Sequence, residues 1–195
     1  DRAAVAAGAD GPGGGKAVII GDARTDKTEA MFRRFGRFVD SLNGRYITAE
    51  DVGMSTAEMV NIRKETNNVA GLPEEMGGSG DPSPVTAYGV YCGMKAAAKT
   101  AYGNDDLNGR KVAIQGAGNV GRGLVGYLAK DGAKVFLTDI HDDKLAAIKA
   151  EHPSITIVKP NEIYDLDMDI YSPCALGATV NDETLPKLKC SVIAG

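Results

Sequence analysis

A glycine-rich turn between a strand and a helix constrains the fold of this chain more than any other feature. The apolar run KVAIQ ends at Gln115, and Gly116, Gly118 and Gly121 follow in GxGxxG spacing. The first glycine permits a tight turn, the second lets the backbone approach a pyrophosphate, and the third allows close packing of helix on strand. The free amides at the start of that helix would then face the phosphates. The sequence therefore predicts a dinucleotide-binding turn.

An acidic residue follows at the place where a ribose-binding carboxylate belongs. The next apolar run, KVFLT, ends directly before Asp139, about 20 residues beyond Gly116. An acid here favours the free 2′-hydroxyl of NAD over the phosphate of NADP. In the alternative interpretation, Asp139 only caps the turn that follows it. Strand, glycines, helix and acid in this order favour NAD binding by Gly116, Ala117, Gly118, Asn119, Val120, Gly121 and Asp139.

Apolar runs and helical patterns alternate through the second half of the chain. This alternation predicts a parallel sheet with right-handed crossovers. We expect an α/β fold, a Rossmann-type parallel sheet with part of a second α/β substrate domain. The predicted strands are 111–115, 134–138, 155–158, 169–173 and 191–195, with helices after Gly121, over 142–152 and, as short turns, near 161–164 and Leu185.

The first half of the chain shows fewer and shorter elements. Strands are expected at 17–20 and 46–48, and helices over 26–42 and from the capping box of Ser55 and Glu58 to about Lys64. Residues 67–84 are rich in turn-forming residues. Ser83 is then a predicted N-cap with Pro84 at the first helical position, opening a long helix through Tyr102. The resulting division is a partial substrate domain over 1–85, a linking helix over 86–103 and a cofactor domain over 104–195, incomplete at its C-terminus.

Charge and composition exclude several classes of function. The net charge of −4 gives no electrostatic reason to expect nucleic acid or an anionic membrane as partner. Three cysteines without CxxC spacing and two histidines argue against a metal site or a histidine-based triad, and reduced thiols favour a cytoplasmic protein. The chain begins without a secretory pattern and ends at Gly195 as a strand enters a loop, so a fragment is expected.

Five ordered segments carry a resemblance to one enzyme family. GGGKAVIIGD, ITAEDVG, GDPSPVTAYGV, QGAGNVG and SPCALG resemble the glutamate/leucine/phenylalanine/valine dehydrogenase family, from Gly13 to Gly195. The resemblance implies a homo-oligomeric enzyme that oxidatively deaminates a small L-amino acid with NAD, giving a 2-oxo acid and ammonia. GDPSPVTAYGV and DVG most resemble the branched-chain members, which implies L-leucine or another branched-chain substrate.

The resemblance also implies roles for individual residues. Lys16 matches the catalytic lysine and Asp51 the catalytic aspartate, although composition alone would make them a surface lysine and a turn residue. A lysine partly desolvated beside glycines can handle protons near neutral pH, and its cationic form can stabilise a developing oxyanion. A nearby carboxylate can take and return protons at the substrate nitrogen.

Other matches concern the cofactor and the substrate. Ser83 and Thr86 match the hinge region that contacts nicotinamide, while Cys174 and Ala175 match a loop passing near the cofactor. Cys174 is interpreted as a packed thiol, since no histidine stands beside it in sequence. The family's second lysine, which grips the substrate carboxylate, is replaced by Arg2 or by an alanine, and Ala70 stands where threonine is usual in the branched-chain members.

Two alternatives to a branched-chain dehydrogenase stay open. A catalytically silent NAD-binding fragment would follow if the chain ends where the sequence ends. A phenylalanine, valine or glutamate dehydrogenase of the same family is the second alternative, because the residues of its substrate pocket lie partly outside this chain. Turnover is what separates these possibilities.

Overall fold

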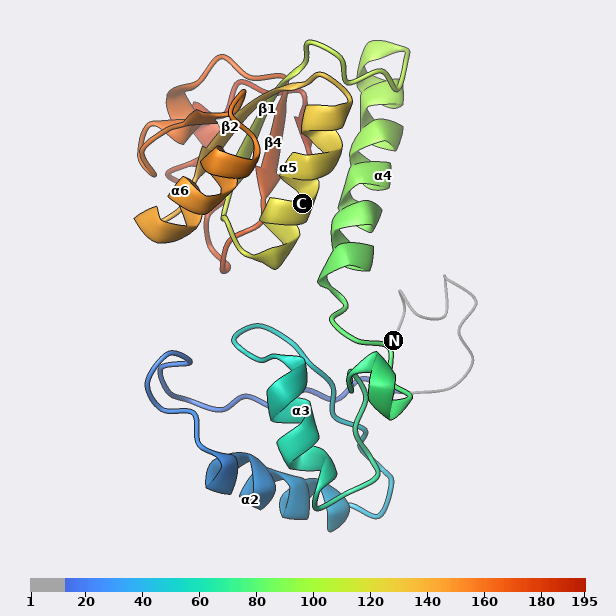
Figure 1. Ribbon diagram of the computed structural model, residues 1–195. Helices are drawn as coiled ribbons and strands as arrows, with labels where there is room; N and C mark the ends of the chain where they lie inside the picture. Colours follow the sequence, from blue (N-terminus) through green and yellow to red (C-terminus); the bar gives the residue numbers. More distant parts are fainter. Residues whose placement is uncertain (1–12) are drawn as a thin grey trace. The chain divides into compact units, whose positions relative to one another are not determined.

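Five parallel strands form the sheet of residues 83–195, one of two units into which the chain divides (Figure 1). The computed structural model describes residues 13–195, and the other unit extends to Pro82. The strand order β3-β2-β1-β4-β5 confirms the predicted parallel sheet. The strands are β1 (Lys111–Gln115), β2 (Lys134–Thr138), β3 (Thr156–Ile157), β4 (Ile170–Pro173) and β5 (Val192–Ile193), the third and fifth being shorter than expected.

Apolar side chains lie on both faces of this sheet, because a parallel sheet is buried on both faces. Val112 and Ile114 of β1 point into one core, which the helices in front of the sheet in Figure 1 complete with Leu124, Leu128 and other buried residues. Ala113 and Tyr171 point into a second core on the opposite face. The helices of this unit are α4 (Ser83–Tyr102), α5 (Asn119–Lys130) and α6 (Asp142–Glu151), with 3-10 turns η2 (Ile163–Asp165) and η3 (Leu185–Lys187).

Helix α4 begins at Ser83, whereas the sequence predicted Ser83 as the N-cap and Pro84 as the first helical residue. It packs along α5, where the Tyr91 hydroxyl donates to Asp131 Oδ2 at 2.7 Å and the Tyr91 and Tyr127 rings stack 5.1 Å apart. The hydrogen bond to Asp131, together with burial, raises the pKa of Tyr91 to about 12. Helix α4 is therefore fixed to the sheet unit by aromatic and polar contacts.

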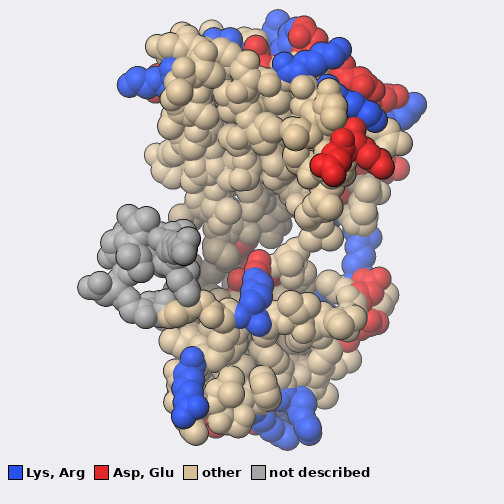
Figure 2. All heavy atoms as spheres, turned by 180° about the vertical axis from the view of Figure 1, so that it is seen from behind, with Lys and Arg blue, Asp and Glu red and all other residues tan. Residues whose placement is uncertain are grey.

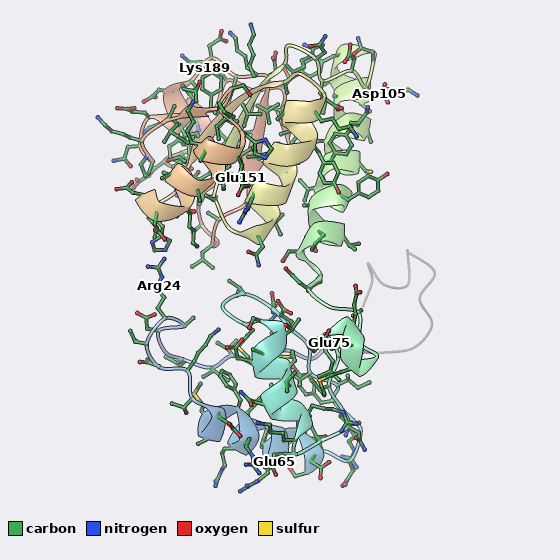
Figure 3. The ribbon with its side chains drawn as sticks, in the orientation of Figure 1. Arg24, Glu65, Glu75, Asp105, Glu151 and Lys189 are labelled. Carbon is green, nitrogen blue, oxygen red and sulfur yellow. The ribbon has the colours of Figure 1, made fainter. Side chains whose placement is uncertain are left out.

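Two helices organise the described part of the first unit, and none of its described residues forms a strand. Helix α2 (Glu29–Asp40) begins after Thr28, whose hydroxyl accepts from Met31 N, and α3 (Thr56–Arg63) begins with the predicted capping box. Their buried faces meet at Phe32, Met59 and Ile62. Glu65, labelled in Figure 3, accepts from Arg33 Nε at 2.6 Å and from Arg37 Nε at 3.0 Å, which ties the end of α3 to α2. A short 3-10 turn, η1 (Glu74–Met76), lies in the expected turn-rich segment.

Both strands predicted in this unit are wrong as continuous strands. Residues 17–20 form no strand, and Val18 and Ile20 are 78% and 98% exposed. Of the segment 46–48, only Thr48 pairs, in an isolated parallel bridge with Val69. A strand needs a neighbour to satisfy its backbone groups, and the described residues supply none beside 17–20.

Charge on the surface is mixed rather than of one sign. On the face shown in Figure 2, acidic and basic side chains alternate along the rim of the sheet unit. Between residues 13 and 195, no helix is both long and apolar enough to cross a membrane.

Candidate active site

The three glycines of the turn after β1 have different structural causes. Gly116 has φ +114°, and a Cβ there would lie 2.5 Å from the Cys174 carbonyl oxygen. A Cβ at Gly121 would lie 2.0 Å from the Gly116 carbonyl oxygen. A Cβ at Gly118 would meet nothing within 4 Å. The chain itself therefore requires glycine at 116 and 121, whereas the space above Gly118 is open to a ligand.

The first turn of helix α5 lies beside this open space, because the helix begins directly after Gly118. Gly118 is its N-cap and has no side chain with which to cap the helix start. Unpaired amides and the positive end of the helix macrodipole make such a terminus a place for an anion. The turn therefore fits a pyrophosphate, as its glycine spacing predicts.

Asp139 is held by two backbone amides. Its Oδ2 accepts from Ala117 N at 2.6 Å, inside the glycine-rich turn, and its Oδ1 accepts from His141 N at 2.9 Å. The second bond is the capping role of the alternative interpretation, and the first bond joins the carboxylate to the dinucleotide turn. Asp139 thus stabilises both segments, and its position at the end of β2 is compatible with a bound ribose.

The loop after β4 lines the turn from the other side. Cys174 N donates to the Gln115 carbonyl oxygen at 2.8 Å, and Ala175 N would lie 2.7 Å from a Cβ at Gly116. The Cys174 thiol lies 3.4 Å from Ser172 Oγ, and burial raises the pKa of this thiol, which keeps it protonated. These contacts support the interpretation of Cys174 as a packed side chain.

Ser83 and Thr86 lie on the first turn of α4, in the same unit as the glycine-rich turn. The next residue, Ala87, is buried, and its Cβ would be 2.8 Å from a Cβ at Gly123 of α5. This close approach brings the start of α4 against the first turns of α5. Both residues stay candidates for cofactor contact.

The structure also brings Lys16 and Asp51 together. Lys16 Nζ forms an ion pair with Asp51 Oδ2, while Asp51 Oδ1 accepts from Val52 N at 2.8 Å. A turn closed by Met54 N donating to the Asp51 carbonyl oxygen at 2.9 Å fixes the carboxylate. Before Lys16, Gly15 accommodates the Tyr46 ring, which would lie 2.9 Å from a Cβ there.

Both members of this ion pair are more than half exposed. The Lys16 and Asp51 side chains are 65% and 56% exposed. The neighbouring segment 17–20 is exposed as well, since it has no strand partner among the described residues. The ion pair therefore forms in a solvated setting.

Two buried polar oxygens without partners precede the two site carboxylates. They are Glu50 Oε2, in the residue before Asp51, and Thr138 Oγ1, in the residue before Asp139. Neither oxygen has a hydrogen-bond partner within residues 13–195. Burial raises the pKa of Glu50, and the nearby charges of Asp81 and Glu58 raise it further, against the opposing effect of Lys27. Sequence reasoning missed both residues because their burial depends on distant segments, so no local pattern marks them.

Two family models match the chain in succession. The dimerisation domain of the Glu/Leu/Phe/Val dehydrogenases matches residues 6–68, and the Glutamate/Leucine/Phenylalanine/Valine dehydrogenase model matches residues 77–144. Leucine dehydrogenase of Geobacillus stearothermophilus is 57% identical over 183 residues, which is 94% of this chain and 50% of that protein. The chain belongs to the glutamate/leucine/phenylalanine/valine dehydrogenase family. Phenylalanine dehydrogenase of Lysinibacillus sphaericus is 49% identical, covering 94% of this chain and 49% of that protein.

Solved structures of dehydrogenases of this kind share the fold. L-tryptophan dehydrogenase from Nostoc punctiforme is 41% identical with a TM-score of 0.65, covering 87% of this chain and 47% of that one. A hetero-hexameric glutamate dehydrogenase from Thermus thermophilus, at 20% identity and TM-score 0.70 over 89% of this chain and 48% of that one, supports the fold alone. The chain spans about half the length of the curated relatives it matches.

Membership of this dehydrogenase family implies a nicotinamide cofactor. The open space at Gly118, the uncapped start of α5 and Asp139 fit the phosphates and a ribose of such a cofactor. No cluster of three or more His, Cys, Asp or Glu side chains in the described part of the chain could hold a metal ion. Arg2, the candidate for the carboxylate-binding position, lies outside the described residues, and Ala70 N donates to the Thr48 carbonyl oxygen at 2.8 Å.

Proposed function

We propose that the protein of which this chain is part oxidatively deaminates L-leucine, or another branched-chain L-amino acid, to a 2-oxo acid and ammonia with NAD. The observation that carries this proposal is the 57% identity to a leucine dehydrogenase over 94% of the chain. The Lys16–Asp51 pair and the turn after β1 supply the two kinds of site that such a reaction needs.

The site residues divide the reaction between them. Bound NAD would accept the hydride from Cα of the amino acid, leaving an imine after loss of a proton from nitrogen. Asp51 takes that proton and later returns one as ammonia leaves. Lys16, as a cation, stabilises the oxyanion that develops when water adds to the imine carbon. In the sheet unit, residues Gly116 to Gly121 bind pyrophosphate and Asp139 binds ribose. Ser83 and Thr86 contact the nicotinamide, and the loop with Cys174 and Ala175 passes near the cofactor.

The remaining assignments follow from the same proposal. Residues 1–85 form part of the substrate domain, 86–103 a linking helix and 104–195 the NAD-binding domain. The match to a dimerisation domain over residues 6–68 supports a homo-oligomer. We place the enzyme in the cytoplasm, with a small amino acid as its substrate.

Turnover by this chain tests the proposal. NADH formation would be followed with L-leucine, L-valine, L-isoleucine, L-phenylalanine and L-glutamate as substrates. Fastest turnover with a branched-chain amino acid is the expected result. Preference for phenylalanine or glutamate would contradict the substrate assignment. Binding of NADH without turnover would leave the chain a silent cofactor-binding fragment.

The choice of NAD over NADP depends on Asp139. Replacing it with asparagine removes the charge and keeps a single acceptor oxygen, so one of the two backbone amides, Ala117 N or His141 N, is left without an acceptor. Charge-assisted hydrogen bonds of this kind contribute about 1.5–3 kcal/mol. We expect Asp139→Asn to weaken NAD binding about 10- to 100-fold and to reduce the preference for NAD over NADP. Asp142→Asn, at an exposed position in the first turn of α6, is the matched control. Equal effects of both substitutions would contradict a specific role for Asp139.

A further inference from the structure

The segment that carries Lys16 lacks backbone support within the described chain. Residues 13–20 form no strand, and no backbone hydrogen bond joins them to any other described residue. Each of these residues is exposed. A segment of this kind has low local stability, because its backbone groups bond to water and few of its side chains are packed. The direction of Lys16 toward Asp51 must therefore come from contacts with side chains.

The ring of Tyr46 makes such a contact one residue before the lysine. A Cβ at Gly15 would lie 2.9 Å from both Cδ2 and Cε2 of Tyr46, so the edge of the ring occupies the place of a side chain at position 15. Gly15 is not among the glycines with positive φ. The ring, and not the backbone conformation, is therefore what favours a glycine there.

Tyr46 belongs to a segment that the fold holds in place. Two residues later, Thr48 forms the parallel bridge with Val69. Thr48 N donates to the Asn68 carbonyl oxygen at 3.0 Å, and Ala70 N donates to the Thr48 carbonyl oxygen at 2.8 Å. Thr48 is buried and Tyr46 is half-buried. The ring that meets Gly15 is therefore attached to a fixed backbone.

The ion pair alone is a weak restraint on the lysine. Both of its side chains are more than half exposed, and an exposed pair contributes little net free energy. A lysine stem is also flexible, so the amine can leave the carboxylate whenever its backbone moves. The contact at Gly15 acts on that backbone, directly beside Lys16. The two contacts thus restrain the backbone and the amine separately.

We propose that Tyr46 is a positioning residue for Lys16. Its ring holds the backbone at Gly15 against the fixed segment and so directs the amine toward Asp51. This inference rests on the proposed function, because that function is what gives Lys16 its role in turnover.

The first test is Tyr46→Ala in the whole chain, with NADH formation from L-leucine and NADH binding as readouts. Misplacement of a reacting group by about 1 Å can lower turnover about 100-fold. We expect turnover to fall about 10- to 100-fold, and NADH affinity to change less than about twofold, because the glycine-rich turn lies in the other unit. Tyr46→Phe keeps the ring and is expected to restore turnover.

The same substitution in the Lys16→Ala background separates positioning from a general structural role. Two residues that act through one group are not additive. Once the amine is absent, Tyr46→Ala is expected to lower the remaining turnover less than about twofold. A residue that only stabilises the unit, or that acts through Asp51, would lower turnover equally in both backgrounds.

Two glycines supply a matched pair of substitutions in the lysine segment. Gly15→Ala places a methyl group 2.9 Å from the Tyr46 ring and is expected to lower turnover about three- to tenfold. Gly13→Ala adds the same group two residues earlier, where a Cβ would meet nothing within 4 Å. It is expected to change turnover less than about twofold. Equal effects of the two substitutions would contradict a role for the ring.

A second measurement does not need turnover. Reductive methylation with formaldehyde, followed by peptide mass spectrometry, gives the labelling rate of each lysine, and a carboxylate partner slows this rate. Release of Lys16 in Tyr46→Ala is expected to raise its labelling rate about 1.5- to fivefold, the range for loss of an exposed ion pair. The rate at Lys64, which pairs with Glu29, is expected to stay unchanged. Asp51→Asn is the reference for complete loss of the pair.

Each outcome decides one claim. Equal loss of turnover in both backgrounds, or unchanged labelling at Lys16, would overturn the positioning role while the proposed function stands. If Tyr46→Ala fails to fold, Gly15→Ala keeps the ring and takes its place in both measurements. If the wild-type chain turns over no amino acid, the proposed function is wrong for this chain, and the labelling of Lys16 then decides the positioning role alone.

Discussion

Replacing Lys16 with alanine is expected to lower NADH formation from the amino acid about 10²- to 10⁴-fold, the range for loss of a single acid–base or oxyanion-stabilising group. NADH binding is expected to stay unchanged, because Lys16 lies in the first unit and the glycine-rich turn lies in the second. The substitution also removes the ion pair to Asp51, whose Oδ1 keeps its bond from Val52 N. The carboxylate would thus stay in its turn without its cation.

Two further variants distinguish proton exchange by Lys16 from the effect of losing an ion pair. Lys16→Arg keeps a cation beside Asp51, but a guanidinium does not give up a proton in the working range of pH. If the amine must exchange protons, this variant stays almost as slow as Lys16→Ala. Lys64→Ala removes an exposed lysine that pairs with Glu29 at 2.8 Å, and it is expected to change turnover less than about twofold. Full activity of Lys16→Ala would contradict the catalytic assignment.

Gly121→Ala is expected to destabilise the sheet unit by about 3 kcal/mol, near the upper end for overpacking substitutions. The added methyl group would lie 2.0 Å from the Gly116 carbonyl oxygen, a backbone atom that cannot move without opening the turn. Since the turn would bind the pyrophosphate, NADH affinity is expected to fall at least about 100-fold. Thermal unfolding and NADH titration measure the two effects separately.

Two other glycines are the controls for this prediction. A Cβ at Gly118 meets nothing within 4 Å, so Gly118→Ala should leave stability unchanged and still weaken NADH binding, where the cofactor would need the space. Gly126→Ala, inside α5 with its nearest neighbour at 4.0 Å, should stabilise the helix by about 0.5–1 kcal/mol and leave binding intact. Unchanged NADH binding in Gly118→Ala would contradict a pyrophosphate at this turn.

Local patterns predicted elements in both units. The runs KVAIQ and KVFLT became β1 and β2, and Ser55 with Glu58 formed the expected capping box, because such signals operate within a few residues. Segments whose structure depends on a distant partner were predicted poorly. Residues 17–20 have the composition of a strand but no neighbour among the described residues to pair with.

In the candidate site too, residues marked by a local pattern could be predicted, and residues that depend on distant segments could not. The glycines and Asp139 could be found because their spacing is fixed by the turn itself. The contact of Tyr171 with Gln115 could not, since it joins two strands and requires the sheet register to be known. Glu50 reads as an ordinary surface acid in the sequence, and only the fold buries its Oε2.

The double attachment of Asp139 has an evolutionary consequence. A substitution at this position that admits a 2′-phosphate and has no side-chain acceptor also leaves Ala117 N without its partner, and so loosens the segment that grips the pyrophosphate. A switch of coenzyme preference is therefore epistatic. A lineage or a library that moves toward NADP must first, or at the same step, acquire another acceptor for that amide, and single substitutions at 139 are expected to yield poor enzymes with either coenzyme.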